Sequence, residues 1–490
     1  MKHPNAEIRA LIYAQAITVS VGTNESGNAL SSVDLYPGGI VESIIVAQDY
    51  CSGMGVVCQA ALAGLYDIND LPAVWEWGSV SALNQTGVAE EVVDTMSIEI
   101  EQGLITVDNS TISAVHREYF EIPSGFSYTP QVGILSLGQG GDGTKPFNYV
   151  TGQNFPGYLA TQNITSSNSF GLHYGSASLG LGGSLVWDGY DQSRVIGKIG
   201  VFQHYQQGDL VVPLLLDIQI GVENGTSPLN NSNSITSLLQ LNESFNGFQS
   251  TIVNPLVPYF FLPETCANIA QHLLVKLQPD IGLYIRNTDD PQTKRVVQSP
   301  TYPALVFQST SGYLTIKIPF QLLNLSLEPS IVSLQQKYFP CQPFHASDGS
   351  GNYYLGRAFL QATFLSINWD SGNFFLAQGP GPAAAEPNIK SIQPKDTNLD
   401  SDPISGFLTA WNKTWTPLAS QSQSTNTDTS AKPPGNNTSK AFPSKRGGLS
   451  DRLRAGIGDL DEKEAGTVYK EAGGEGLPHE TPTDSRVHEM

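Results

Sequence analysis

The sequence predicts an all-β protein, from its composition and from the alternation of its apolar residues. Hydrophobic residues make up 40% of the 490 residues and charged residues only 14%, and the chain contains 48 glycines and 31 prolines. This mixture favours short strands joined by many turns over long amphipathic helices. The length is sufficient for two or three domains.

Short apolar runs bounded by turn residues follow one another through most of the chain. Each run has the length and alternation of a strand. The predicted strands lie within residues 17–23, 31–37, 42–48, 96–107, 183–190, 211–222, 313–325 and 362–378. A short helix is predicted within residues 265–277, where apolar residues recur at helical spacing after Pro263 and Glu264.

The order of these elements predicts two β lobes followed by a tail. Each half of residues 14–378 carries an apolar strand, a special turn and cysteines, which places an N-terminal β lobe at 14–200 and a C-terminal β lobe at 201–378. Residues 379–490 have too little apolar content for a core, so we expect a low-complexity, largely disordered tail. Within it, residues 407–418 are apolar enough to pack back on the body.

The four cysteines predict two disulfides. An even number favours the pairs Cys51–Cys58 and Cys266–Cys341, and four buried free thiols in a cytosolic protein are the alternative. The spacing contains no Cys-x-x-Cys pair and no histidine cluster accompanies it. We therefore predict no metal site and no cofactor.

Glycosylation acceptor triplets favour the secretory pathway, and so do the paired cysteines. The triplets begin at Asn24, Asn84, Asn109, Asn163, Asn224, Asn230, Asn242, Asn324, Asn412, Asn436 and Asn437. We expect a secreted or cell-surface protein, although the sequence shows neither a signal peptide nor an apolar run that could span a membrane. This combination suggests an incomplete gene model or an unconventional start. The net charge of −20 argues against a nucleic-acid partner, and we expect a monomer.

Residues 251–263 read as an apolar strand, a turn containing Asn254 and Pro255, and a second apolar run ending at Leu262-Pro263. This stretch resembles the second active-site loop of the pepsin-like aspartic peptidases. In that family an apolar strand leads into Asp-Thr/Ser-Gly and is followed by an apolar strand ending at Leu-Pro. Asn254 stands where the resemblance places the catalytic aspartate.

Three further stretches are similar to the same family, in particular to its divergent members from filamentous fungi. VGILSLG at 132–138 resembles the end of an inner strand of the first lobe, residues 169–200 resemble an interdomain hairpin, and residues 352–378 resemble the closing block. The stretches occur in family order over roughly the first 380 residues. The resemblance implies the bilobal aspartic-peptidase fold.

The resemblance also implies the chemistry to look for, which is two carboxylates that share one proton so that one acts as base and the other as acid. In the first lobe, alignment on Cys51 places Pro37, Gly38 and Gly39 over Asp-Thr-Gly, and Pro37 offers no acid. Asp34 is a displaced candidate that would need a slip in strand register. Asn254 is an amide and cannot act as a general base.

Other candidate sites have simpler interpretations. Asp370-Ser371-Gly372 spells Asp-Ser-Gly, but it falls within the closing strand block and is predicted to be an ordinary turn. Tyr174-Gly175-Ser176 lies in a predicted hairpin and is not a nucleophile elbow. The histidines His116, His173, His204, His272 and His345 are scattered, without metal-ligand spacing.

These observations predict a catalytically inactive aspartic-peptidase homologue with no catalytic residues. We expect it to bind an extended peptide or a cell-wall polysaccharide between the lobes. One alternative is an active acid endopeptidase with a displaced dyad that uses Asp34. The other is a structural surface glycoprotein without a ligand.

Overall fold

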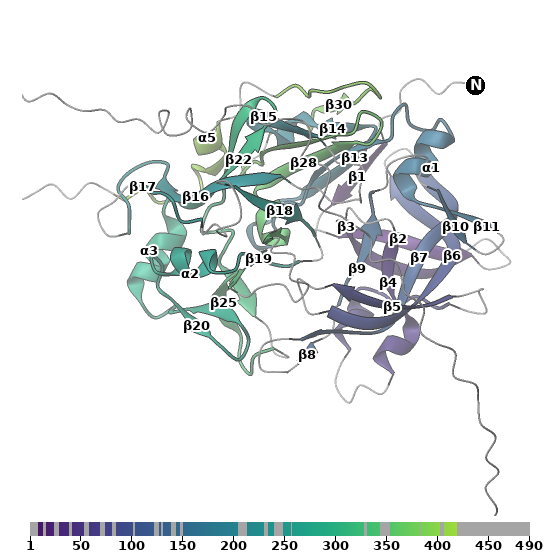
Figure 1. Ribbon diagram of the computed structural model, residues 1–490, viewed down its shortest axis with the longest axis horizontal. Coiled ribbons are helices and arrows are strands. Elements are labelled where there is room, and N and C mark those ends of the chain that lie inside the picture. The colour runs from purple at the N-terminus through teal and green to yellow at the C-terminus, as the bar shows by residue number, and fades with distance from the viewer. Residues whose placement is uncertain are drawn as a thin grey trace, which may run out of the picture. The chain divides into compact units, whose positions relative to one another are not determined.

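Strands dominate the computed structural model of this protein, and its helices are short (Figure 1). The predicted all-β class is confirmed, and the predicted strands all appear. In the part of the chain that the structure describes, no helix is both long and apolar enough to cross a membrane. The described residues lie in a compact unit of residues 1–422. They are 8–12, 16–23, 29–38, 42–52, 58–68, 74–80, 85–100, 103–121, 127–128, 131–138, 144–147, 150–203, 213–229, 234–239, 248–255, 257–327, 331–343, 353–383, 385–401 and 406–418.

The first part of the chain forms a ten-stranded sheet, here called the N-terminal sheet. Its order is β10-β11-β7-β4-β9-β3-β2-β6-β5, with β8 paired to β7. Ile17, Val19 and Val21 are buried while Thr18 is exposed, as expected for strands with one face on the core. The strands are β2 (Ile17–Thr23), β3 (Ala29–Gly38), β4 (Ser43–Val46), β5 (Val74–Val80), β6 (Gln85–Ile100), β7 (Gly103–Glu121), β8 (Ser127–Tyr128), β9 (Gly133–Ser136), β10 (Thr144–Phe147) and β11 (Val150–Gln153).

A six-stranded sheet takes strands from both ends of the chain, and we call it the shared sheet. Its order is β1-β13-β12-β28-β29-β15. Every residue of β12, β13, β28 and β29 is buried, so both faces of the sheet are covered. The predicted lobe boundary after residue 200 falls inside β15, which pairs with β29. The strands are β1 (Ile8–Ile12), β12 (Ser169–His173), β13 (Gly183–Trp187), β15 (Ile196–Gln203), β28 (Thr363–Asn368) and β29 (Asn373–Gln378).

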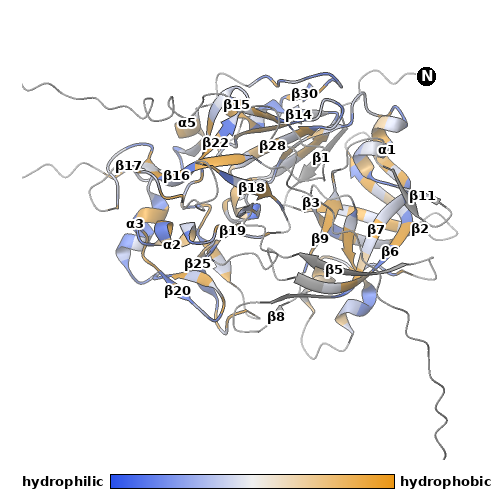
Figure 2. Ribbon diagram, in the orientation of Figure 1, coloured by the Kyte–Doolittle hydropathy of each residue, from blue (hydrophilic) through white to orange (hydrophobic). Residues whose placement is uncertain are grey.

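The last part of the chain forms an eight-stranded and a four-stranded sheet. Figure 2 shows hydrophobic residues along β16 of the larger sheet. The larger sheet has the order β23-β22-β16-β18-β27-β19-β26, with β17 beside β16, and the smaller has the order β20-β21-β25-β24. The strands are β16 (Leu214–Val222), β17 (Ser234–Ile235), β18 (Gln249–Val253), β19 (Phe260–Phe261), β20 (Val275–Gln278), β21 (Leu283–Arg286), β22 (Thr301–Ser309), β23 (Gly312–Lys317), β24 (Leu325–Leu327), β25 (Gln336–Phe339), β26 (Cys341–Gln342) and β27 (Tyr353–Leu355).

The helix predicted within residues 265–277 is shorter than expected. It ends at Ala270, and residues 275–278 form β20 instead. Apolar residues in this stretch fit either a helix or a strand, and the tertiary pairing of β20 with β21 decides the outcome. The helices are α1 (Phe155–Thr161), α2 (Thr265–Ala270), α3 (Pro291–Gln298), α4 (Arg357–Leu360) and α5 (Phe407–Trp411), with 3₁₀ turns η1 (Gln48–Cys51), η2 (Gln59–Leu62), η4 (Ala177–Leu179) and η5 (Gln192–Arg194).

The same pairing pattern occurs twice along the chain. In the N-terminal sheet, β3 runs parallel to β9, and the next strand, β4, pairs antiparallel with β9 and parallel with β7. In the last part, β18 runs parallel to β27, and the next strand, β19, pairs antiparallel with β27 and parallel with β26. Both loops that the sequence singled out, after β3 and after β18, therefore lie at corresponding places.

Secondary structure continues beyond residue 379, where the tail was expected to begin. Residues 389–391 form β30 (Ile389–Ser391), which pairs with β14 (Gly189–Asp191). In α5, Trp411 stacks on Trp415 with ring centres 5.4 Å apart, and Phe407 meets the edge of Tyr302 at 6.0 Å. The predicted packing of residues 407–418 on the body is confirmed, because large aromatic rings bury enough area to order the segment. Residues 419–490 of the predicted tail lie outside the described residues.

Both predicted disulfides are present. Cys51 and Cys58 are joined across seven positions, and Cys266 and Cys341 across 75. The second bond ties α2 to β26, and both of its cysteines are fully buried.

The two disulfides should differ in their contribution to stability. Replacing Cys266 and Cys341 by alanine should lower the free energy of unfolding by about 4 kcal/mol, because the bond closes a long loop in the unfolded chain. The same change at Cys51 and Cys58 should cost only about 2 kcal/mol, because that loop is short. Guanidinium unfolding of the two double variants measures both losses, and equal losses would contradict the expectation.

Candidate functional site

The first loop of interest starts at the end of β3. Pro37 pairs with Leu135 and Gly38 with Ser136 in the parallel ladder to β9. The carbonyl oxygen of Pro37 accepts a hydrogen bond from the hydroxyl of Tyr174. The carbonyl oxygen of Gly38 accepts from the backbone N–H of Leu137 at 2.6 Å. The backbone entering the loop is thus fixed, while Gly39 lies outside the described residues.

The second loop starts at the end of β18. The backbone N–H of Asn254 donates to the carbonyl of Leu355 at 3.1 Å, and its own carbonyl accepts from Val257 at 3.2 Å. Asn254 is buried. The bond from Val257 closes a tight turn, and the bond to Leu355 continues the ladder between β18 and β27. Leu256 lies outside the described residues.

The structure brings the two loops together. A Cβ placed on Gly38 would lie 3.1 Å from Cγ of Pro255, so the backbone of the first loop packs on the second. Arg357, the first residue of α4, joins them further. Its Cζ lies 4.5 Å from the ring centre of Tyr36 on β3, and its Nη1 donates to the carbonyl oxygen of Pro255 at 2.5 Å. A cation stacked on an aromatic ring therefore connects the loops.

The side chains of Tyr174 and Arg357 at this meeting point are a neutral phenol and a cation, and neither is a carboxylate. Burial raises the pKa of Tyr174 strongly, Arg357 opposes the shift and Tyr36 adds to it. Tyr174 is therefore a neutral donor throughout the physiological range, and it holds the carbonyl of Pro37. The guanidinium of Arg357 supplies a fixed positive charge. Neither side chain is a carboxylate that could share a proton in the way a pair of aspartates does.

Asp34 is held within the N-terminal sheet. Its Oδ1 accepts from Oγ1 of Thr18 at 2.6 Å, and its backbone N–H donates to the carbonyl of Ala63 at 2.6 Å. Strand alternation puts Asp34 on the same face of β3 as Tyr36. It is Tyr36, two residues further along, that reaches the second loop through Arg357.

The sequence alignment matches Pro37 in the first loop to Asn254 in the second. The strand register gives a match that differs from this by one residue. In the two parallel ladders, Leu135 lies opposite Pro37 and Leu355 lies opposite Val253. If these two leucines correspond, the counterpart of Asn254 is Gly38, one position after Pro37. Neither Pro37 nor Gly38 carries an acid, so the shift leaves the chemistry unchanged.

The sequence that spells Asp-Ser-Gly is a turn, as predicted. It connects β28 to β29 next to the closing pair Asn368 and Asn373, and Gly372 has a φ of 65°. The Oδ2 atom of Asp370 accepts from the backbone N–H of Asn168 at 2.8 Å. Among the described side chains, no group of three or more His, Cys, Asp or Glu could hold a metal ion. His204 and His345 lie outside the described residues.

Sequence reasoning missed Tyr36, Tyr174 and Arg357, which make the contacts around the loops. Tyr36 directly precedes the turn, and Arg357 is a charged residue inside an otherwise apolar block. The position of Arg357 was the available signal, because a charge in such a block needs a partner. Its partners come from distant parts of the chain, so the sequence could not identify them.

No family model matches the chain, and no curated protein matches it significantly.

Proposed function

We propose that this chain is a catalytically inactive homologue of the pepsin-like aspartic peptidases that binds an extended peptide where its two loops meet. The observation that carries the proposal is the meeting of the loops without a pair of acids. Gly38 packs on Pro255, Arg357 spans Tyr36 and Pro255, and the dyad positions hold Pro37 or Gly38 and Asn254. The pairing pattern that occurs twice along the chain supports a bilobal arrangement.

A binding role follows from the chemistry at the loops. A guanidinium lying on a tyrosine ring is a common recognition surface for carboxylates and peptide carbonyls. The family resemblance adds an extended ligand that runs between the halves as an added strand. We therefore expect peptides to bind without being cleaved.

The purified chain should not hydrolyse denatured haemoglobin at any pH from about 2 to 8, because the dyad positions at Pro37, Gly38 and Asn254 carry no carboxylate. An active pepsin in the same assay controls for sensitivity, and product is measured as new amino groups. Cleavage that pepstatin inhibits would refute the proposal and support an active enzyme using Asp34. The Asp34→Asn variant, if it then abolished the cleavage, would identify the acid.

A structural protein without a ligand is the second candidate. The observation that favours it is the filling of the meeting point by Tyr36, Arg357 and Pro255. Fluorescence anisotropy with labelled decapeptides separates the two. Saturable binding that changes with Arg357→Ala supports the first proposal, and the absence of saturable binding supports the second.

A further inference from the structure

β20 forms one edge of the four-stranded sheet. In the described part of the chain it pairs only with β21. The carbonyl of Leu274 accepts from the N–H of Asn287, and antiparallel hydrogen bonds alternate along a strand. Lys276 and Gln278 therefore bond to β21, while the backbone N–H and C=O groups of Val275 and Leu277 point away from it. Such groups are a template for another strand.

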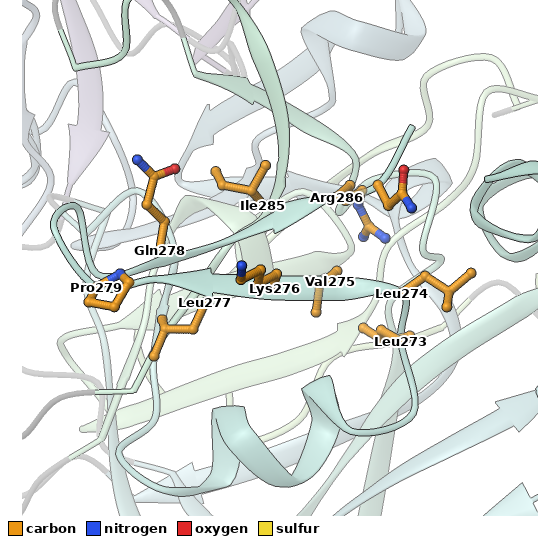
Figure 3. A pocket seen from close by; sticks show the side chains of 10 residues that line it. Leu273, Leu274, Val275, Lys276, Leu277, Gln278, Pro279, Ile285 and Arg286 are labelled. Atoms are coloured by element: carbon orange, nitrogen blue, oxygen red, sulfur yellow. The ribbon is translucent and has the colours of Figure 1, made fainter. Parts of the chain in front are cut away.

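A pocket of about 690 Å³ lies against β20 and the end of β21 (Figure 3). Its lining contains the consecutive residues 273–279, the last two residues of β21, and Asn287 directly after it. Figure 3 shows Leu277 and Gln278 on opposite sides of β20, with Ile285 on the side of Gln278. The pocket therefore follows the strand itself, and its walls alternate between apolar and polar side chains as β20 does.

The lining is cationic in an acidic chain. It contains Lys276 and Arg286 and no Asp or Glu, although the whole chain has 45 acidic and 25 basic residues. Lys276 is exposed. A ligand that enters this pocket meets positive charge, so charge complementarity favours an anionic occupant.

Arg286 is buried with only part of its donor capacity used. It is 5% exposed, its Nη2 donates to the carbonyl of Leu323 at 2.9 Å, and its Cζ lies 5.7 Å from the ring centre of Phe339. Among the described residues its Nε has no hydrogen-bond partner. Burial lowers the pKa of Arg286 to about 10, so it remains charged at neutral pH. The register pairs Arg286 with Val275 and Lys276 with Ile285, so the two cationic side chains lie on opposite faces of the sheet, and an acidic residue placed beside Lys276 meets Lys276 alone.

We propose that the edge of β20 binds an extended acidic peptide as an added strand. The backbone of the peptide pairs with Val275 and Leu277, and an acidic side chain lies beside Lys276. The neighbouring peptide residues on the other face are apolar and lie beside Val275 and Leu277. The recognised pattern is thus apolar, acidic, apolar in consecutive positions. This site is separate from the loops after β3 and β18, and it does not depend on the function proposed for them.

The test uses the full chain and a labelled eight-residue peptide, acetylated and amidated, with Val-Glu-Val at its centre. Fluorescence anisotropy should show saturable binding, and a Val-Lys-Val peptide should bind at least tenfold more weakly. Lys276→Glu should reverse this preference. The matched control is Lys294→Glu, an exposed lysine on α3, which should leave both affinities unchanged.

Two peptides N-methylated at alternate amides test the strand pairing. Only one set of amides can face β20, so one peptide should bind at least tenfold more weakly and the other nearly as well as the parent. Equal affinities of the two N-methylated peptides would overturn the proposal. Equal effects of Lys276→Glu and Lys294→Glu on peptide binding would also overturn it. Hydrogen exchange should show new protection at Val275 and Leu277 on adding peptide. Protection there before any peptide is added would indicate another occupant and would also overturn it.

Discussion

When the pH is lowered from about 6.5 to 3, His173 alone should decrease the free energy of unfolding by roughly 4 to 5 kcal/mol. His173 lies fully buried on β12 in the shared sheet. Burial lowers the pKa of its imidazole from 6.5 to about 3, the positive charge of Arg194 adds to this, and the backbone of Gln361 opposes it. Among the described residues neither ring nitrogen makes a well-formed hydrogen bond.

The direction follows from proton uptake by the unfolded chain. In this pH interval the unfolded state binds a proton at His173 and the folded state does not, so acid favours unfolding. The contribution of this residue is fully present above pH 6.5 and is lost as the pH falls towards 3. A buried neutral histidine therefore lowers the stability of this protein in acid.

The measurement is urea unfolding at several pH values for the wild type and His173→Gln. The wild type should lose more stability on acidification than the variant, and the difference is the contribution of His173. Ser184→Ala is a suitable control, because Ser184 is a buried neighbour of His173 across β12 and β13 and does not titrate. It should shift stability equally at every pH. The same acid sensitivity in wild type and His173→Gln would contradict the interpretation.

Gly356→Ala should lower the free energy of unfolding by about 3 kcal/mol or more. Gly356 lies between β27 and α4, next to the second loop. A Cβ there would overlap the carbonyl oxygen of Val257 and lie 2.6 Å from that of Tyr259. Both obstacles are backbone atoms, so the loop itself must move, and with it Arg357 and its contact to Tyr36.

Gly180→Ala separates this steric effect from loss of glycine's backbone freedom. Gly180 has a φ of 62°, and a Cβ there would meet no atom within 4 Å. Its replacement should cost only about 1 kcal/mol, from the left-handed backbone conformation. Chemical unfolding of both variants gives the comparison. A loss at Gly356 no larger than that at Gly180 would mean that the second loop is not packed as tightly as the structure shows.

Much of the fold was predictable because its signals are local. The alternation in residues 17–23 and the paired apolar runs of residues 362–378 specify strands through the period of the side chains. Residues 265–277 show where this fails. Their apolar spacing fits a helix as well as a strand, and only the pairing of β20 with β21 separates the two outcomes.

The sequence predicted that the candidate site has no acid at the dyad positions. It did not predict which side chains contact one another there. The absence of acids at Pro37, Gly38 and Asn254 is a property of the sequence and needs no structure. The contact between Tyr36 and Arg357 joins residues far apart in the chain, and no local pattern encodes it.

By itself, the sequence determined the all-β class and the lack of an acid at either loop, because each depends on residue type and near neighbours. Only the tertiary structure decided that the cysteines pair as two disulfides, that the loops meet around a cation and that β20 pairs with β21 alone among the described strands. Each of these depends on how the whole chain packs.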